Sequence, residues 1–317
     1  MKRDQRGFAL VITLIVTALL VALVVEFISE VYVDTTSRQS FVDAQKASLM
    51  AESGVTGAIG IMKFSLLKSN YTSLLDPWAK PMDIPEEQGS LRITVEDESA
   101  KLSLNHIVVL PGGASFNDGG GDPTGYYHGT ALRLFKKFNL PASDLCDAIA
   151  DWIDENDTPR PGGGESKWYT NLKNGYQAKN GPLDTVEELA LVKGFSSEVL
   201  DKLRPFITVY GESSSTAPVN INTAPKELLT ALDERISDSL AEQIIEYRKN
   251  SPFKFNSELV RVPGMEQIAT GLILRIAVKS TIYRIRAEAE VNGTTRVIET
   301  VVNFKGGTPV TLYWREY

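Results

Sequence analysis

The sequence contains one cysteine, Cys146, and two histidines, His106 and His128, among its 317 residues. One cysteine cannot close a disulfide within the chain, so a disulfide-stapled scaffold is excluded. The same shortage argues against a structural zinc site, which is built from Cys and His ligands. Basic residues are also in the minority, because 33 Lys and Arg face 40 Asp and Glu, a net charge of −7. Such a chain is a poor general binder of polyphosphate, which argues against nucleic acid as a partner.

The overall composition is that of a globular protein. Hydrophobic residues make up 43% of the chain and charged residues 23%, so wholesale disorder and collagen-like repeats are excluded. The length favours about two domains.

The N-terminal segment carries one long apolar run. Residues 8–25 contain no charge, and as a helix they span roughly 27 Å, close to the thickness of one hydrocarbon core. Lys2, Arg3 and Arg6 precede the run. By the positive-inside rule, the start of the chain is expected to stay cytoplasmic and the rest to cross the membrane.

Three kinds of N-terminal signal compete for this run. A cleaved secretory signal is disfavoured because the run is long and the bulky residues 24–27 offer no small-residue cleavage site. A plain signal anchor is the simplest alternative. The third is a prepilin-type signal, in which a short basic leader ends in glycine and the apolar helix is retained. Gly7 followed by Phe8 fits that pattern, with cleavage after Gly7 and residues 1–7 as the leader.

The predicted helix continues beyond the membrane. Residues 26–67 contain no proline and carry an intermittent apolar stripe, so one helix is expected over residues 8–67, with residues 8–25 in the membrane. A long helix half in lipid and half packed on a domain is the shape of a pilin-like subunit. A membrane anchor with a helical stalk is the alternative.

Strands and loops are predicted on either side of a helical block. Residues 68–90 contain three prolines and are expected to form a loop, whereas residues 91–96 alternate as a strand. Residues 101–107 are expected to form a second strand. Residues 111–129 hold seven glycines and are expected to form a flexible surface loop.

The second half of the chain changes period from helix to strand. Periodic apolar stretches predict helices within residues 130–280, after which alternation over residues 283–291 predicts a strand. Asn292-Gly293 offers a two-residue hairpin turn, followed by a returning strand over 296–304. Residues 308–314 are expected to add an edge strand.

This order of elements predicts an α+β domain interrupted by a helical insertion. The expected segments are residues 68–110 and 280–317 for the α+β domain, with residues 125–279 as an inserted all-α domain.

The richest cluster of polar side chains lies at residues 151–165, where a predicted helix ends in a Pro/Gly loop. Hard oxygen ligands on a flexible loop are what Ca²⁺ requires. Carboxylates near a helix C-terminus also need compensation, which a cation supplies. The candidate ligands are Asp151, Asp154, Asn156, Asp157 and Glu165.

Two other interpretations of this cluster remain open. One is a solvated acidic helix end. The other is an enzyme with Asp154 and Glu165 as acid and base, but the sequence contains no nucleophile elbow, kinase motif set or metalloprotease helix to accompany it. No catalytic residue is therefore assigned, and the chain is not expected to be an enzyme.

A second cluster resembles a helix-hairpin-helix module. It runs from Asn220-Ile221-Asn222-Thr223-Ala224 to the apolar turn at Gly264, and a weaker copy ends at Gly194. Such hairpins hold the DNA backbone in many proteins, but residues 219–280 carry eight basic and eight acidic side chains. A neutral hairpin is a poor phosphate binder, so these are interpreted as structural helix pairs.

These features together resemble the type II secretion minor pseudopilin K family, also called general secretion pathway protein K. The resemblance runs in order through nearly the whole chain. It is carried by Arg6-Gly7-Phe8, the segment 97–105, the Asp151-Trp152-Ile153-Asp154 and Pro159-Arg160-Pro161-Gly162 loop, and Asn220-Ile221-Asn222-Thr223-Ala224. Position 12, the fifth of the processed chain, is Ile12 where most pilin-like subunits have Glu, and family K is similar in this respect.

The resemblance implies a type IV pilin-like fold with an inserted helical domain and Ca²⁺ in the acidic loop. Asp154, Asn156 and Glu165 match that loop best, and Asn156 stands where the family often has Asp. It also implies cleavage after Gly7 by prepilin peptidase and methylation of Phe8.

The expected place of such a subunit is the bacterial inner membrane and periplasm. It would form a tip complex with minor pseudopilins I and J, on a filament of the major pseudopilin. The alternatives are a tip minor pilin of a type IV pilus and a membrane-anchored DNA receptor.

Overall fold

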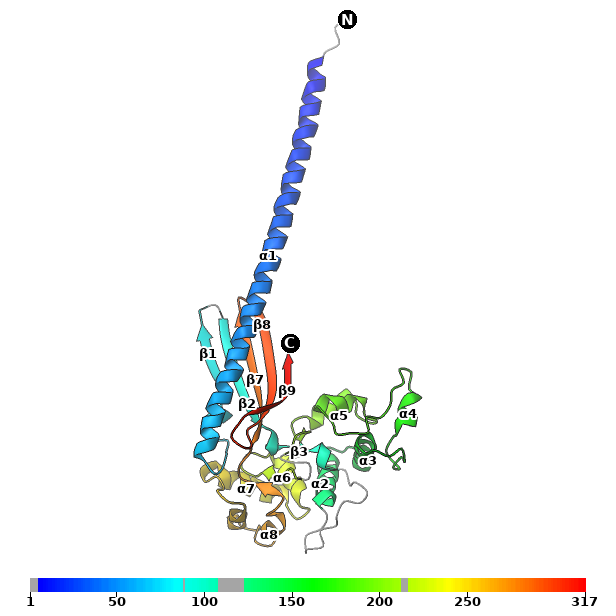
Figure 1. Ribbon diagram of the computed structural model, residues 1–317, viewed down its shortest axis with the longest axis vertical. Helices are drawn as coiled ribbons and strands as arrows, with labels where there is room; N and C mark the ends of the chain where they lie inside the picture. The colour runs from blue at the N-terminus through cyan, green and yellow to red at the C-terminus, as the bar shows by residue number, and fades with distance from the viewer. Residues whose placement is uncertain (1–4, 88, 108–122, 212–215) are drawn as a thin grey trace.

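A computed structural model describes residues 5–87, 89–107, 123–211 and 216–317. Helix α1, Gln5–Lys68, is a single continuous element whose N-terminal half projects away from the rest of the chain (Figure 1). The large apolar side chains of that half, from Phe8 to Ile28, are exposed. The predicted long helix is thereby confirmed.

The C-terminal half of α1 packs on one face of a five-stranded antiparallel sheet. The order is β1-β2-β7-β8-β9, and the strands are β1 Met82–Glu86, β2 Gly89–Asp97, β7 Ile282–Val291, β8 Thr294–Asn303 and β9 Val310–Glu316. Ala47, Ala51 and Ala58 face the sheet and are almost fully buried. These small side chains let the helix lie close to Ala287 and Ala289 of β7, which are also buried.

Two predictions in the strands are wrong. The segment expected to be a loop contains β1, which tolerates Pro85 because an edge strand can leave one side of its backbone unpaired. The strand expected over residues 101–107 shrinks to Leu102–Ser103 (β3), which is followed by the 3-10 helix η3, Leu104–His106. The partner of β3 is β4, Ile207–Thr208, over a hundred residues away in the chain.

Other expectations hold or fall outside the described residues. The hairpin β7–β8 turns at Asn292 and Gly293, both with positive φ, and β9 is the predicted edge strand. Of the expected glycine-rich loop, residues 111–122 lie outside the described residues. Its last part is not a loop, because α2, Pro123–Lys137, begins there, with proline at the first helical position where its missing N–H is tolerated.

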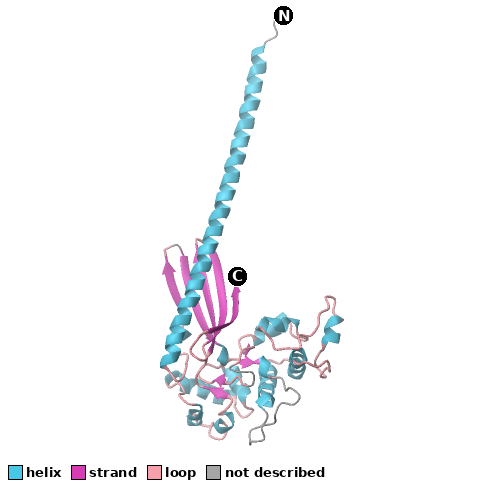
Figure 2. Cartoon of the chain, in the orientation of Figure 1, coloured by secondary structure: helices cyan, strands magenta, loops and turns pink. Residues whose placement is uncertain are grey.

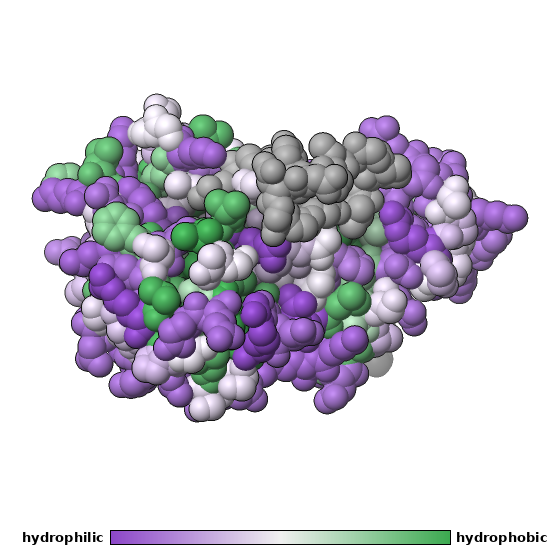
Figure 3. Space-filling model, turned by 90° about the horizontal axis from the view of Figure 1, so that it is seen from below, coloured by the Kyte–Doolittle hydropathy of each residue, from purple (hydrophilic) through white to green (hydrophobic). Residues whose placement is uncertain are grey.

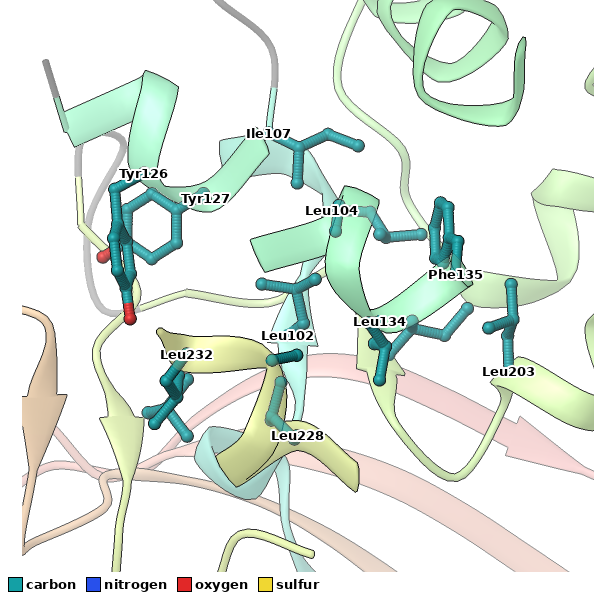
Figure 4. Packing of buried hydrophobic residues seen from close by; sticks show 14 of the residues in the cluster. Leu102, Leu104, Ile107, Tyr126, Tyr127, Leu134, Phe135, Leu203, Leu228 and Leu232 are labelled. Carbon is teal, nitrogen blue, oxygen red and sulfur yellow. The ribbon is translucent and has the colours of Figure 1, made fainter. Parts of the chain in front are cut away.

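Between β2 and β7 lies the helical insertion, which Figure 2 shows as a separate body below the sheet. Its larger helices are α2, α3 Ala142–Ile153, α6 Lys226–Leu232 and α7 Asp238–Asn250. Shorter ones are α4 Ser166–Thr170, η4 Val186–Leu191, α5 Ser197–Leu203, η5 Asn256–Arg261 and α8 Ala269–Leu272. Its own core includes Leu104, Phe135 and Leu228 (Figure 4).

The insertion is not purely helical, because it also holds two short parallel strand pairs. One is β3–β4, and the other pairs β5, Val219–Asn220, with β6, Ile276–Ala277. Viewed from its far end (Figure 3), the coloured surface is mostly polar, with apolar residues scattered among polar ones. That surface suits water, in contrast to the exposed apolar half of α1.

The two strand pairs belong to two copies of one structural unit. Asn105, after β3, accepts from Leu183 N at 2.8 Å and donates to the carbonyls of Leu183 and Val209. Asn222, after β5, accepts from Phe253 N at 2.8 Å and donates to the carbonyls of Phe253 and Val278.

The turns that follow also correspond. Gly194 after η4 and Gly264 after η5 have φ of 86° and 91°, and each stands eleven residues beyond the clamped Leu183 or Phe253. The weaker hairpin copy suspected from the sequence is therefore a true structural counterpart of the second.

Candidate functional site

The acidic site begins at the C-terminus of α3. Asp151 lies in the last turn of this helix and Asp154 is its C-cap residue, and both are almost completely buried. The C-terminus of a helix carries partial negative charge, so two buried carboxylates there require a positive partner. Burying charged carboxylates without a positive partner costs free energy.

The following loop brings a third carboxylate to the same place. Glu165, the N-cap residue of α4, is also buried, and one oxygen each of Asp151, Asp154 and Glu165 lie within 4.8 Å of one another. The return of the loop depends on Gly163, where a Cβ would lie 2.1 Å from Oδ2 of Asp151. Any larger residue there would displace the Asp151 carboxylate.

Arg160 supplies the positive charge that the loop itself contains. Its Nη1 donates to Oδ1 of Asp151 at 2.7 Å and to Oδ2 of Asp154 at 2.5 Å. Its backbone N–H also donates to Oδ2 of Asp151 at 3.0 Å. Arg160 is thus a functional residue that the sequence reasoning quoted in a motif without assigning it a partner.

Glu165 is the carboxylate of the three that has no hydrogen bond within the described residues. Both of its side-chain oxygens are buried and accept no hydrogen bond from a protein group. Burial, and then the charges of Asp151, Asp154 and Asp157, raise the pKa of Glu165 to about 7. A buried carboxylate in this state is an available ligand for a cation.

The two other candidate ligands take different positions. Asn156 lies beside the cluster, with Nδ2 donating to Oδ1 of Asp154 at 2.8 Å and Oδ1 accepting from Thr158 N at 2.8 Å. Asp157 is exposed, and its carboxylate is outside the group of three. The structure therefore brings together Asp151, Asp154 and Glu165, and leaves Asn156 and Asp157 at the edge.

The donor atoms of this site match those of a cation-binding site. Three convergent carboxylates form an all-oxygen donor set, which hard cations such as Ca²⁺ prefer, and the lack of a hydrogen bond to Glu165 fits such an ion. An acid/base pair across a substrate has less support. Asp154 borders a cavity of about 590 Å³, but Glu165 is not among its lining residues.

The N-terminal site lies at the far end of α1. Phe8 is 72% exposed, and a Cβ on Gly7 would meet no atom within 4 Å. Helix α1 is long and apolar enough to cross a membrane, and the most apolar window of 18 residues is wholly unburied. Gly7 and Phe8 are therefore not covered by other described residues of the chain.

A buried polar network joins the sheet to the helical insertion, and the sequence reasoning missed it. Oδ2 of Asp97 accepts from Ser280 Oγ at 2.6 Å, from Thr223 Oγ1 at 2.5 Å and from Asn220 Nδ2 at 3.1 Å. Asn220 and Thr223 belong to the motif Asn220-Ile221-Asn222-Thr223-Ala224. The signal available in the sequence was that Asn220, Asn222 and Thr223 are polar residues within an otherwise apolar stretch.

Comparisons with known proteins agree on one family. Two family models, both described as type II secretion system (T2SS), protein K, match residues 100–212 and 219–278, together more than half of the chain. The type II secretion system protein K of Pseudomonas aeruginosa is 26% identical, over 82% of this chain and 78% of that protein. The Klebsiella pneumoniae protein is also 26% identical, over 85% and 83%, and the Aeromonas hydrophila protein is 29% identical, over 73% and 72%.

A solved structure gives the same answer for the fold. The matching chain comes from the crystal structure of the GspK-GspI-GspJ complex of the enterotoxigenic Escherichia coli type 2 secretion system, with a TM-score of 0.72 and 22% identity. The match covers 89% of this chain and 99% of that one. The long helix, the antiparallel sheet and the helical insertion all belong to this fold. With the two family models covering more than half its length, the chain belongs to the protein K family of the type II secretion system.

Proposed function

We propose that this chain acts by assembly, as the minor pseudopilin at the tip of the type II secretion pseudopilus. The observation that carries the proposal is the position of the helical insertion. It lies at the end of the sheet opposite the projecting half of α1 (Figure 1). A pseudopilus is built by packing such helices side by side. The helical insertion, on the side away from the membrane-spanning half of α1, would block the addition of a further subunit on that side.

The partners proposed are minor pseudopilins I and J. The similar solved chain was crystallised in a complex named GspK-GspI-GspJ, and the present protein aligns with nearly all of that one chain. Ile12 supports a place at the tip. A carboxylate at position 12 would lie in lipid, where it is costly unless a neighbouring subunit pairs with it. A subunit at the tip has no neighbour above it to supply that pair, so Ile12 fits the tip position.

Assembly is proposed to start in the inner membrane. Prepilin peptidase would cut after Gly7, Phe8 would become the methylated N-terminus, and the apolar half of α1 would anchor the chain with its bulk in the periplasm. The exposed apolar surface of that half would then pack on partner helices. The resulting filament would serve the export of folded periplasmic proteins.

Co-expression tests the assembly. The full-length chain, produced with prepilin peptidase and pseudopilins I and J of its own system, should co-purify with both in detergent. Intact-mass analysis should show loss of residues 1–7 and one added methyl group. Cells lacking the chain should form fewer pseudopili. Unprocessed chain, or processed chain that binds neither I nor J, would reject the tip assignment.

Ca²⁺ is the proposed ligand of Asp151, Asp154 and Glu165. An ion there would neutralise the three carboxylates and fix the loop between α3 and α4 to the end of α3. Calorimetry on the EGTA-treated full-length protein in detergent should detect Ca²⁺ binding that Glu165→Gln weakens at least tenfold. Asp201→Asn, an exposed carboxylate on α5, is the matched control and should leave binding unchanged. Equal binding by Glu165→Gln would remove Glu165 from the site.

A further inference from the structure

The positive charge within the acidic loop has a second consequence. We propose that Arg160 is an internal counter-cation that competes with Ca²⁺ for Asp151 and Asp154, so that ion binding requires its guanidinium to leave. The inference rests on the proposed Ca²⁺ site. It adds a residue that opposes binding and thereby sets the Ca²⁺ concentration at which the loop changes state.

The competition follows from shared oxygens. Nη1 of Arg160 bridges Oδ1 of Asp151 and Oδ2 of Asp154 at 2.7 and 2.5 Å. An ion held by these two carboxylates and Glu165 must lie close to the same atoms, at roughly 2.3–2.6 Å from each ligand. Two cations cannot share that position, because their repulsion at such a separation in a buried place is large.

The Arg160 guanidinium neutralises the three carboxylates of the site only in part. The guanidinium donates to Asp151 and Asp154 but leaves Glu165 without a hydrogen bond. Three carboxylates against one guanidinium leave an excess of negative charge, which a divalent ion neutralises more fully. The guanidinium therefore stabilises the site without neutralising all of its charge, so a divalent cation that neutralises more of it can replace the guanidinium.

The guanidinium can leave without unfolding the loop, because three other hydrogen bonds hold the main chain of the loop. Arg160 N donates to Asp151, Gly162 N donates to Oδ2 of Asp147 at 3.0 Å, and Nζ of Lys193 donates to the Gly163 carbonyl at 2.6 Å. The Arg160 side chain is 28% exposed, so it has a route to solvent. The two states would differ mainly in one side chain.

A purely structural role for Arg160 predicts the opposite behaviour. If the guanidinium only braces the site, its removal weakens folding and Ca²⁺ binding together. If it competes, its removal weakens the ion-free protein and strengthens Ca²⁺ binding. The two effects on affinity have opposite signs, so one titration separates them.

The experiment measures Ca²⁺ binding by calorimetry on the EGTA-treated full-length protein in detergent, for wild type, Arg160→Gln and Arg160→Lys. The matched control is Arg204→Gln, which removes one positive charge from an ion pair with Glu187 elsewhere on the insertion. Arg160→Gln should bind at least tenfold more tightly than wild type, and the control should not. Arg160→Lys keeps the charge on a shorter side chain, which should bridge Asp151 and Asp154 less well than Nη1 of Arg160 does, so it should also bind more tightly than wild type.

Thermal unfolding and chemical labelling supply independent readouts. In EGTA, Arg160→Gln should melt below wild type, and saturating Ca²⁺ should remove the difference. In the wild-type protein, phenylglyoxal should modify Arg160 faster with Ca²⁺ than with EGTA, which needs no variant to fold. Unchanged or weaker binding by both variants, or labelling that Ca²⁺ does not accelerate, would overturn the competition while leaving the ion site standing. Absence of binding by wild type and both variants would overturn the ion site and the competition together. None of these results bears on co-purification with I and J.

Discussion

Nε of Arg284 on β7 donates to Oε1 of Glu98 at 2.8 Å, across the point where the chain leaves the sheet for the helical insertion. The Glu98 carboxylate is 1% exposed and also accepts hydrogen bonds from Nζ of Lys101, at 3.0 Å, and from the hydroxyl of Thr208. Burial by itself raises the pKa of Glu98, but Lys101 and Arg284 hold it below its ordinary value. One carboxylate thus ties the sheet to both ends of the first repeat of the insertion.

Replacing this carboxylate should loosen the junction. Glu98→Gln removes the charge that faces Arg284 and Lys101 in a buried place, so the free energy of unfolding should fall by about 2–3 kcal/mol. Denaturant unfolding of the full-length protein in detergent measures the change. Glu290→Gln, on the exposed face of the same strand β7, should change it by less than about 0.5 kcal/mol. Equal effects of the two variants would show that the junction does not depend on Glu98.

The neighbouring Asp97 should give stability a dependence on pH. Its hydrogen-bond donors among the described residues are neutral groups, and burial raises its pKa above the ordinary value of 3.8. The folded state therefore binds a proton more readily than the unfolded state, and the associated stability is lost as pH rises through the raised pKa. Unfolding free energies of wild type minus Asp97→Asn should decrease as pH increases above about 4. Asp201→Asn, an exposed control, should give a flat difference, and a rising difference for Asp97→Asn would contradict the prediction.

The two asparagine clamps should have similar energetic weight. Asn222→Ala leaves the N–H and the carbonyl of Phe253 without their partner, which should cost about 2–4 kcal/mol of stability, whereas the Val278 carbonyl keeps its bond from Thr72 N. Asn105→Ala should cost a comparable amount, since it makes the same three bonds in the first repeat. Asn174→Ala, at an exposed position, serves as control in the same unfolding experiment. A small effect at one clamp alone would mean that the two repeats do not depend on it equally.

The sequence predicted the parts of the fold that depend on local pattern. The apolar period of α1, the alternation of β7 and the Asn292-Gly293 turn each carry their own signal, and all three are present. β1 was missed because the three prolines of residues 68–90 indicate a loop, whereas the one proline inside β1, Pro85, costs little at the sheet edge. That position is set by pairing with β2 and cannot be seen in the segment alone.

The site shows the same limit at the level of single residues. The density of oxygen ligands on a helix end and loop placed Asp151, Asp154 and Glu165 among five candidates, and the structure brings these three together. Asn156, which the family resemblance favoured over Asp151, lies at the edge of the group. Spacing said nothing of Arg160, whose guanidinium reaches back across the loop to α3. The Asn105 clamp was equally hidden, because its partners Leu183 and Val209 lie 78 and 104 residues away.

Gly163 should be the most sensitive backbone position of the acidic loop. A methyl group there meets Oδ2 of Asp151 at 2.1 Å and the Asp147 carbonyl at 2.9 Å, and neither can move without disturbing the end of α3. Gly163→Ala should therefore lower the free energy of unfolding by about 1–3 kcal/mol. It should also weaken Ca²⁺ binding, because Asp151 is displaced from Asp154 and Glu165. Gly181→Ala is the matched control, since the nearest atom to its added methyl is the Lys179 carbonyl at 3.9 Å. Thermal unfolding and calorimetry on both variants decide the matter, and a Gly163→Ala protein as stable as the control would show that the loop can yield at this point.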